Sequence, residues 1–245
     1  MKENEKEDKK TIKNTTGWSP FVGCKFDCIY CNDSYKPILR RFDHGCQQCH
    51  DYAPHTHPTR IPGKSHGKYL KPYKLPSSSV LFVAENGDIS FCDPVFVVNE
   101  IINAMREDKK QGRVFLLQSK NPAYFAQILH GLPQNVVLMT TIESNRHYPE
   151  VSKAPPPSQR FQEFLQLDWP RKAMVMEPIL KFDLKTILDW ATELKPEAVL
   201  IGLESKRRCT LPEPTPSEIE ELHRELRNLG FKTYDKATFK YLDVF

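Results

Sequence analysis

The chain has 245 residues, of which 39% are hydrophobic and 27% charged, and its formal net charge is +4. This size suits one large domain, and so small a charge does not by itself indicate a nucleic-acid partner. No run of about 18 apolar residues is present, and the charged N-terminus lacks the apolar core of a secretory signal, so we expect no membrane segment. The seven cysteines are clustered and odd in number, which argues against a disulfide framework and favours a reducing cytoplasm.

The N-terminal part of the chain falls into three segments. Residues 1–13 alternate acidic and basic side chains, so we expect a disordered tail followed by one domain over 14–245. Trp18 to Cys24 is predicted to be a first strand. Residues 32–79 are rich in Pro, His, Tyr and Lys without periodicity, which predicts a long basic insertion after that strand. The insertion could be a solvated loop or could bind a polyanion.

The insertion contains a Cys-x2-Cys-His motif formed by Cys46, Cys49 and His50. Two cysteines at this spacing are a common half-site for tetrahedral zinc, which needs four N or S ligands. We therefore predict a second metal site made of these three residues, which His44, His55 or His57 could complete. The alternative is a pair of thiols without metal on a loop.

From about residue 79 onward, apolar strands alternate with amphipathic helices. The predicted strands are 79–84, 114–117, 135–142, 173–176, 198–203 and 232–235, and the predicted helices are 94–109, 119–129, 160–167, 184–194 and 215–230. Strands separated by helices imply a parallel sheet. Counting the first strand, there are about six βα units, fewer than the eight of a closed barrel. The predicted fold is α/β, a partial (β/α)6 TIM-type barrel with a long Cys/His-rich insertion after the first strand.

Polar side chains recur where these strands end. In parallel α/β folds the ligand lies beyond the carboxyl ends of the strands, so carboxylates and amides repeated there indicate a binding site. Each could instead be a helix cap or part of a surface ion pair. The candidates are Glu85, Asn86, Ser119, Lys120, Glu143, Ser144, Asn145, Glu177 and Glu204. Cys92 and Cys209 could be reactive thiols or ordinary buried residues.

Three further cysteines, Cys24, Cys28 and Cys31, follow the first strand with the spacing Cys-x3-Cys-x2-Cys. A cubane iron–sulfur cluster normally takes four thiolates, so three would leave one iron open to another ligand. An open metal position is typical of catalytic sites, whereas a closed one is usually structural. The alternatives are a zinc site or an electron carrier whose fourth thiolate comes from Cys46, Cys49, Cys92 or Cys209.

This motif, with Tyr30 just before its last cysteine, resembles the cluster motif of radical S-adenosylmethionine (radical SAM) enzymes. The resemblance implies a [4Fe-4S] cluster on the three cysteines and SAM on the open iron. Reductive cleavage of SAM in that family commonly gives a 5′-deoxyadenosyl radical that abstracts hydrogen from substrate. The electron comes from a reductant such as flavodoxin or ferredoxin. The family's partial barrel agrees with the topology predicted from the periodicity.

The resemblance also implies roles for the residues at the strand ends. Tyr30 would lie beside the adenine of SAM. The family often carries Gly-Gly-Glu after the second strand to hold the methionyl amino group; this chain has Ala84-Glu85-Asn86-Gly87, so Glu85 and Asn86 are the candidates. The other implied contacts are Glu143, Ser144 or Asn145 with the ribose, Ser119 and Lys120 with the SAM carboxylate or the substrate, and Glu177 and Glu204 with the substrate. These two glutamates are catalytic candidates, as is Cys209, which lies after a strand end near the expected mouth of the barrel.

The sequence thus predicts a radical SAM enzyme whose substrate, a nucleic acid or nucleotide among the candidates, is open. The strand-end patterns around Glu143, Glu177 and Glu204 are similar to a small, poorly characterised prokaryotic and phage-associated branch, which names no substrate. Two other classes remain: a zinc-dependent nucleic-acid-binding module, and an electron-transfer iron–sulfur protein.

Overall fold

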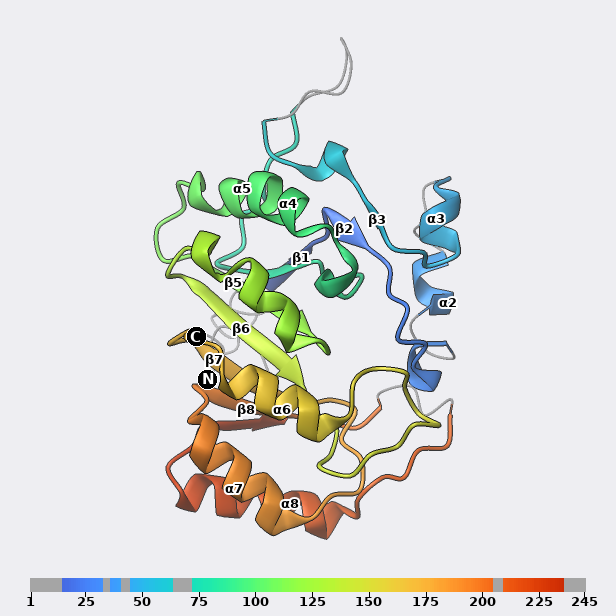
Figure 1. The fold of residues 1–245 in the computed structure, drawn as a ribbon, viewed down its shortest axis with the longest axis vertical. Coiled ribbons are helices and arrows are strands. Elements are labelled where there is room, and N and C mark those ends of the chain that lie inside the picture. The colour runs from blue at the N-terminus through green and yellow to red at the C-terminus, as the bar shows by residue number, and fades with distance from the viewer. Residues whose placement is uncertain (1–14, 33–35, 41–44, 64–71, 205–208, 236–245) are drawn as a thin grey trace, which may run out of the picture.

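The computed structural model describes residues 15–32, 36–40, 45–63, 72–204 and 209–235 (Figure 1). The tail predicted over residues 1–13 lies outside this part of the chain. Parts of the predicted insertion, residues 33–35, 41–44 and 64–71, lie outside it as well.

Seven parallel strands form one curved sheet in the order β1-β4-β5-β6-β7-β8-β9. Their bounds are Thr15–Trp18 (β1), Val80–Val83 (β4), Val114–Ser119 (β5), Val136–Thr141 (β6), Lys172–Met176 (β7), Ala198–Ile201 (β8) and Thr233–Asp235 (β9). Every strand pairs with the next in this order, as expected where crossover connections link neighbouring parallel strands. The predicted partial barrel is therefore confirmed at the level of architecture.

Helical segments connect the strands and cover the sheet (Figure 1). The α-helices after β4 are α4 (Pro94–Phe96), α5 (Asn103–Arg106), α6 (Pro157–Leu165), α7 (Leu184–Leu194) and α8 (Pro216–Asn228). A π-helical turn, Val97–Ile102, joins α4 to α5, and 3-10 helices cover Ile89–Phe91, Pro122–Gln127 and Leu129–Gly131. The helix predicted over 119–129 is thus 3-10 rather than α-helical.

The two faces of the sheet carry different apolar groups, because side chains alternate along each strand. Trp18, Leu81 and Phe115 pack with helix residues such as Ile101 and Phe161 in the large core. The opposite set consists of strand residues alone and includes Phe82, Leu116, Val137, Val175 and Leu200. All six residues of β6 are buried, as expected of a central parallel strand covered on both faces.

The first strand lies earlier in the chain than predicted. β1 pairs with β4 from Thr15 to Trp18, and Phe21–Val22 (β2) belongs to a separate antiparallel pair with His55–Thr56 (β3). Pro20 separates the two segments; it has no N–H to donate to a ladder, so a continuous strand to Cys24 is unfavourable. The prediction of a strand from Trp18 to Cys24 was therefore wrong.

Besides the helical residues 29–32 of the cysteine loop, the described residues between β1 and β4 include β2 and β3, two short helices and a 3-10 turn. The helices are α2 (Lys36–Leu39) and α3 (Gln47–His50), and the turn covers Pro58–Arg60. In Figure 1 these elements lie on the side of the molecule opposite to α7 and α8. They border the loop that carries the three clustered cysteines.

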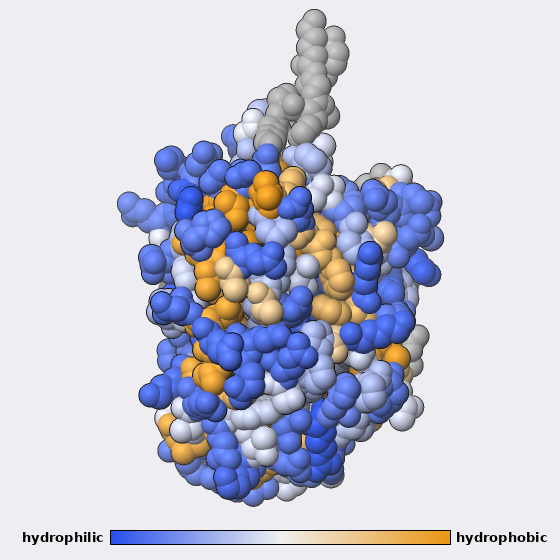
Figure 2. Space-filling model, in the orientation of Figure 1, coloured by the Kyte–Doolittle hydropathy of each residue, from blue (hydrophilic) through white to orange (hydrophobic). Residues whose placement is uncertain are grey.

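The surface in Figure 2 is mostly hydrophilic, with apolar residues in small groups, one of them over α4 and α5. Val95 of α4 is 64% exposed. None of the helices in the described ranges has both the length and the apolar character needed to cross a bilayer.

Candidate functional site

The loop after β2 brings the thiols of Cys24, Cys28 and Cys31 together at the carboxyl end of the sheet. Cys28 is buried, while Cys24 and Cys31 are partly exposed. The backbone N–H of Phe26 donates to Cys24 Sγ at 3.4 Å, and Cys28 Sγ is hydrogen-bonded to Ser152 Oγ at 3.1 Å. Each of these two contacts orients one thiol of the loop.

Hydrogen bonding and burial shift the pKa values of the three thiols in different directions. The hydrogen bond with Cys31 lowers the pKa of the Cys28 thiol to about 6, outweighing the effect of burial. The same bond raises the pKa of Cys31, and burial raises that of Cys24. Cys28 is therefore the thiol that most readily becomes a thiolate, the form that binds metal.

The surroundings of the thiols fit an iron–sulfur cluster. Apolar side chains of Phe26, Tyr30, Val151 and Leu180 pack around them, and Phe91 lies against Phe26 at a ring-centroid distance of 4.8 Å. Such an enclosure limits the access of solvent to a cluster, which is one of the ways a protein tunes it. The three sulfurs could hold three irons, and a ligand from outside the loop would then meet the fourth.

Two backbone contacts from the connection between β6 and α6 close the loop from the other side. Ile29 N–H donates to Val151 O at 3.0 Å, and Lys153 N–H donates to Phe26 O at 2.8 Å. The loop therefore owes its shape to residues more than a hundred positions later in the chain.

The turn after β4 packs directly on the start of the cysteine loop. Gly23 and Gly87 form an isolated parallel bridge, and Asp88 N–H donates to Gly23 O at 3.1 Å. A Cβ atom at Gly87 would lie 2.6 Å from Gly23 O and 2.7 Å from Gly23 N, both backbone atoms. Glycine at 87 thus allows the two turns to touch.

Replacing Gly87 with alanine is expected to displace the loop and to lower the iron bound per chain, because neither backbone can yield cheaply at that distance. The matched control is Gly131→Ala, whose Cβ would meet side chains at 3.4 Å or more. Iron would be measured after anaerobic reconstitution. Equal iron in Gly87→Ala and the parent would show that this contact does not position the loop.

Asp88, which was not among the sequence candidates, is a buried carboxylate that joins β4 to β5. It accepts hydrogen bonds from Ser90 N–H at 3.1 Å, Ser119 Oγ at 2.6 Å and Lys120 N–H at 2.8 Å. Burial raises its pKa. The predicted cofactor contact Ser119 is thus 1% exposed, with its hydroxyl donated to Asp88, which makes it a support for the site.

A second buried network surrounds Glu143. Its Oε1 accepts from Tyr30 OH at 2.9 Å and from Lys120 Nζ, and its Oε2 lies 2.7 Å from Arg160 Nη1. Burial acts to raise the pKa of Glu143, but Arg160 and Lys120 outweigh it and hold the pKa at about 2. Lys120 Nζ also lies 4.7 Å from the centroid of the Tyr30 ring. Two cations thus share one carboxylate beside the cysteine loop.

Arg160 was also absent from the candidates predicted from the sequence, although the apolar pattern of α6 indicates that it is buried. Pro157, Arg160, Phe161 and Phe164 are the buried residues of that helix, and they recur at helical spacing on one face. An arginine on an apolar face must find a buried partner. Its Nη1 donates to Thr141 O as well as facing Glu143.

A pocket adjoins this network and the cysteine loop. Its lining includes Glu143 and Arg160 on one side and Ser152, whose hydroxyl contacts Cys28, on another. Arg146, His147 and Tyr148 line it as well. A molecule in this pocket would contact Glu143 and Arg160, and Ser152 would lie between it and the Cys28 thiol.

Ser144 and Asn145 support the backbone after β6. Ser144 Oγ donates to Lys181 O at 2.5 Å, and Asn145 exchanges two hydrogen bonds with Asp183, at 2.8 and 2.7 Å. Ser144 is fully buried. These two predicted cofactor contacts therefore connect β6 to the segment that leads into α7.

The remaining candidates lie around the same edge of the sheet. The Glu85 carboxylate lies over Gly17 of β1, where any side chain would collide with it, and burial of the carboxyl raises its pKa. Asn86 N–H donates to Ser19 Oγ, and its carbonyl accepts from Gly23 N–H. Glu177 directly follows β7, and Glu204 is buried beyond β8. Cys209 packs against the apolar group that encloses Cys28 and Tyr30.

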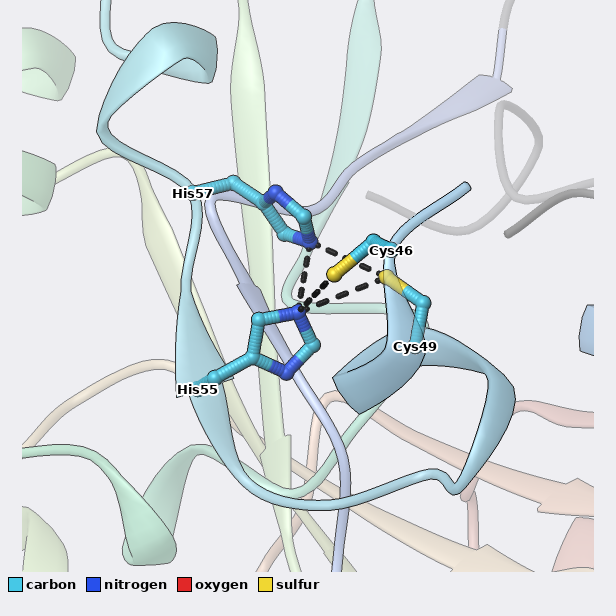
Figure 3. Close-up of side chains that lie close together, drawn as sticks. All are labelled: Cys46, Cys49, His55 and His57. Carbon is cyan, nitrogen blue, oxygen red and sulfur yellow. Dashed lines mark hydrogen bonds between the residues drawn. The ribbon is translucent and has the colours of Figure 1, made fainter. Parts of the chain in front are cut away.

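The Cys46 and Cys49 thiols converge with His55 and His57, two of the histidines named as able to complete the site, and not with His50. Figure 3 shows Cys46, Cys49, His55 and His57 pointing toward one another. Their four ligand atoms all lie within 4.8 Å of one another. His50 points elsewhere: its Nδ1 lies 3.2 Å from Asp51 Oδ1, and almost half of its side chain is exposed. The prediction that His50 joins the two cysteines is therefore replaced by His55 and His57.

Comparison with solved structures places the fold. The structure of "Spore photoproduct lyase complexed with dinucleoside spore photoproduct" superposes with a TM-score of 0.52 over 89% of this chain and 75% of that one. The fold resembles that of spore photoproduct lyase. The sequence identity is 10%, so the likeness is one of fold. No protein-family model and no curated protein sequence matches the chain.

Proposed function

We propose that this chain is a radical SAM enzyme in which Cys24, Cys28 and Cys31 hold a [4Fe-4S] cluster and SAM completes it. The observation that carries the proposal is the meeting of three thiols at the carboxyl end of a parallel half-barrel, beside a pocket lined by Glu143 and Arg160. The fold likeness supports it, because spore photoproduct lyase is a radical SAM enzyme. A reductant such as flavodoxin or ferredoxin would supply the electron.

When bound, the cluster and SAM supply reductive cleavage of a carbon–sulfur bond; the chain's own residues bind and orient. Lys120 and Arg160 share the single carboxylate of Glu143, so the three side chains together carry a net positive charge. That charge suits an anionic group such as the SAM carboxylate. Glu85, with its carboxylate over Gly17, is suited to accept from the SAM ammonium. Phe26, Phe91 and Leu180 limit the access of water to the thiols.

Tyr30, Glu143, Ser144 and Asn145 take supporting roles in this proposal. Glu143 fixes Lys120, Arg160 and the Tyr30 hydroxyl, while Ser144 and Asn145 hold the backbone beneath the pocket. Glu177, Glu204 and Cys209 remain the residues that we assign to the substrate side. Of these, Cys209 lies against the same apolar group as the cluster loop.

For the substrate we propose a nucleic acid or nucleotide. The fold neighbour was solved with a dinucleoside photoproduct, and cationic and aromatic side chains, Arg146, His147 and Tyr148, line the pocket of this chain. Such residues suit phosphate contact and base stacking. DNA or RNA oligonucleotides are expected to increase the rate of 5′-deoxyadenosine formation above the rate measured without them.

One observation favours a second candidate, an electron-transfer protein. Cys209 could supply a fourth thiolate, since it packs against the loop group, and a closed cluster would then have no place for SAM.

Electron paramagnetic resonance of the reduced, anaerobically reconstituted protein separates the two candidates. We expect a cubane signal that changes when SAM is added, in the parent and in Cys209→Ser alike. A signal that ignores SAM in the parent but responds in Cys209→Ser would identify a closed cluster and overturn the proposal. Zinc in place of iron at the three cysteines would instead favour a zinc-dependent nucleic-acid-binding module.

A further inference from the structure

The group formed by Cys46, Cys49, His55 and His57 lies outside the proposed active site and requires its own explanation. Cys46 directly precedes α3 and Cys49 lies within it, while His55 is in β3 and His57 follows that strand. Cys49 is 6% exposed and the other three are partly buried. Two thiols and two imidazoles pointing at one spot form the donor set of a tetrahedral zinc site.

The distances in this group are close to those around a single ion: two lie within the expected range and two are shorter by a few tenths of an ångström. His55 Nε2 lies 3.6 Å from Cys46 Sγ and 3.4 Å from Cys49 Sγ, and His57 Nε2 lies 3.1 Å from Cys49 Sγ and 2.8 Å from His55 Nε2. Bonds of about 2.3 Å to sulfur and about 2.0 Å to nitrogen at tetrahedral angles place neighbouring ligand atoms roughly 3.3 to 3.8 Å apart. A two-iron centre would separate the sulfurs from the imidazoles by more than this.

The tautomer of His55 is set by a contact on its far side. His55 Nδ1 lies 2.7 Å from Ala53 O, where it can only donate, so the neutral ring presents the lone pair of Nε2 to the thiols. A metal-binding histidine is usually oriented in this way, by a hydrogen bond from its other ring nitrogen to a backbone carbonyl. The contact therefore orients His55 as a zinc-binding histidine is oriented.

We propose that Cys46, Cys49, His55 and His57 bind one Zn²⁺ in a closed structural site. Four protein ligands leave no position for water or substrate, so the ion has a structural role. Two thiolates balance its charge, and their softness selects zinc over magnesium or calcium. This proposal goes beyond the radical SAM assignment and does not depend on it.

The site is built into the backbone that leads to Cys24. β3 pairs with β2 through Phe21 with Thr56 and Val22 with His55, and His57 N–H donates to Pro20 O at 2.6 Å. Cys24 N–H donates to Tyr52 O at 3.4 Å. A pair of two-residue strands contributes little stability by itself, so the metal supplies the free energy that orders it. Zinc thereby holds the base of the cysteine loop.

Metal analysis of the full chain, purified anaerobically, tests the ligand set. We expect about one zinc per chain in the parent and in His50→Ala, and loss of that zinc in Cys49→Ser and in His57→Ala. His50→Ala is the matched control because His50 is adjacent to Cys49 yet paired with Asp51. Zinc retained in both ligand variants, or lost in His50→Ala, would overturn the assignment.

X-ray absorption at the zinc edge of the parent keeps the proposal testable should the variants fail to fold. Two sulfurs at about 2.3 Å and two nitrogens at about 2.0 Å are expected. Absence of zinc, or a shell of oxygens, would refute it. Because this readout is specific for zinc, it fails or succeeds separately from iron content and SAM cleavage.

Hydrogen exchange tests the structural role. Amides of residues 21–24, of Tyr52 and Ala53, and of residues 55–57 are expected to exchange faster in Cys49→Ser than in His50→Ala. Equal exchange in the two variants would show that the ion does not order this backbone.

Discussion

Replacing Cys28 with alanine is expected to reduce 5′-deoxyadenosine formation to background and to prevent stable reconstitution of the cluster. Cys28 is the buried member of the three thiols and the one whose pKa, lowered to about 6 by the hydrogen bond with Cys31, most favours the thiolate. A cluster held by two thiolates would be labile. Iron content, visible absorbance and chromatographic assay of 5′-deoxyadenosine measure the effect.

The control for this variant is Cys92→Ala, which removes a buried thiol from the main core rather than from the loop. We expect it to keep the iron and the activity of the parent, with a modest loss of stability. If Cys28→Ala bound as much iron as Cys92→Ala and cleaved SAM at the parental rate, the cluster assignment would be wrong.

Glu143→Ala is expected to lower the free energy of unfolding by about 3 to 5 kcal/mol, because it leaves two buried cations without their shared carboxylate. Lys120 and Arg160 would remain desolvated, and the Tyr30 hydroxyl would lose its acceptor. Urea denaturation measures the change. The control, Asp189→Ala, breaks the exposed Lys185–Asp189 pair on α7 and should cost less than about 1 kcal/mol.

The same carboxylate predicts a dependence on pH. The pKa of Glu143 is lowered from 4.5 to about 2 in the folded chain, so its contribution to stability is complete above pH 4.5. That contribution disappears as the pH falls from about 4.5 to about 2, because the unfolded chain takes up the proton first. Glu143→Ala should therefore lose less stability than the parent over this range. Parallel curves would contradict the buried ion-pair network.

The alternation of strands and helices after residue 79 could be predicted because each element satisfies a local rule. Val114–Ser119 and Val136–Thr141 are short apolar runs, and Thr215 caps α8 by accepting from Glu218 N–H, as a Thr-Pro-x-Glu sequence indicates. The first strand was misplaced because two features set its end. Pairing with β4 is a long-range contact that the local sequence pattern does not contain, whereas Pro20 is a local feature of the sequence.

The candidate site was predictable to the extent that strand ends share one edge of a parallel sheet. Glu143 and Lys120 were placed there, yet their mutual ion pair and the arrival of Arg160 from α6 depend on how a helix packs over the sheet. Similarly, the sequence indicated a metal site at Cys46 and Cys49, but the choice of His55 and His57 over His50 follows from the turn between α3 and β3. Spacing indicates which residue types are available, and the tertiary fold decides which of them meet.

The two backbone bonds from Val151 and Lys153 to the cysteine loop set an order of events during synthesis. Cys24, Cys28 and Cys31 leave the ribosome early, but the wall that receives Ile29 N–H and donates to Phe26 O follows only after more than a hundred further residues. Pairing across such a sequence separation is slow, because the chain between must be ordered first. The proposed cluster would therefore find a complete binding loop only once most of the half-barrel has been translated and folded.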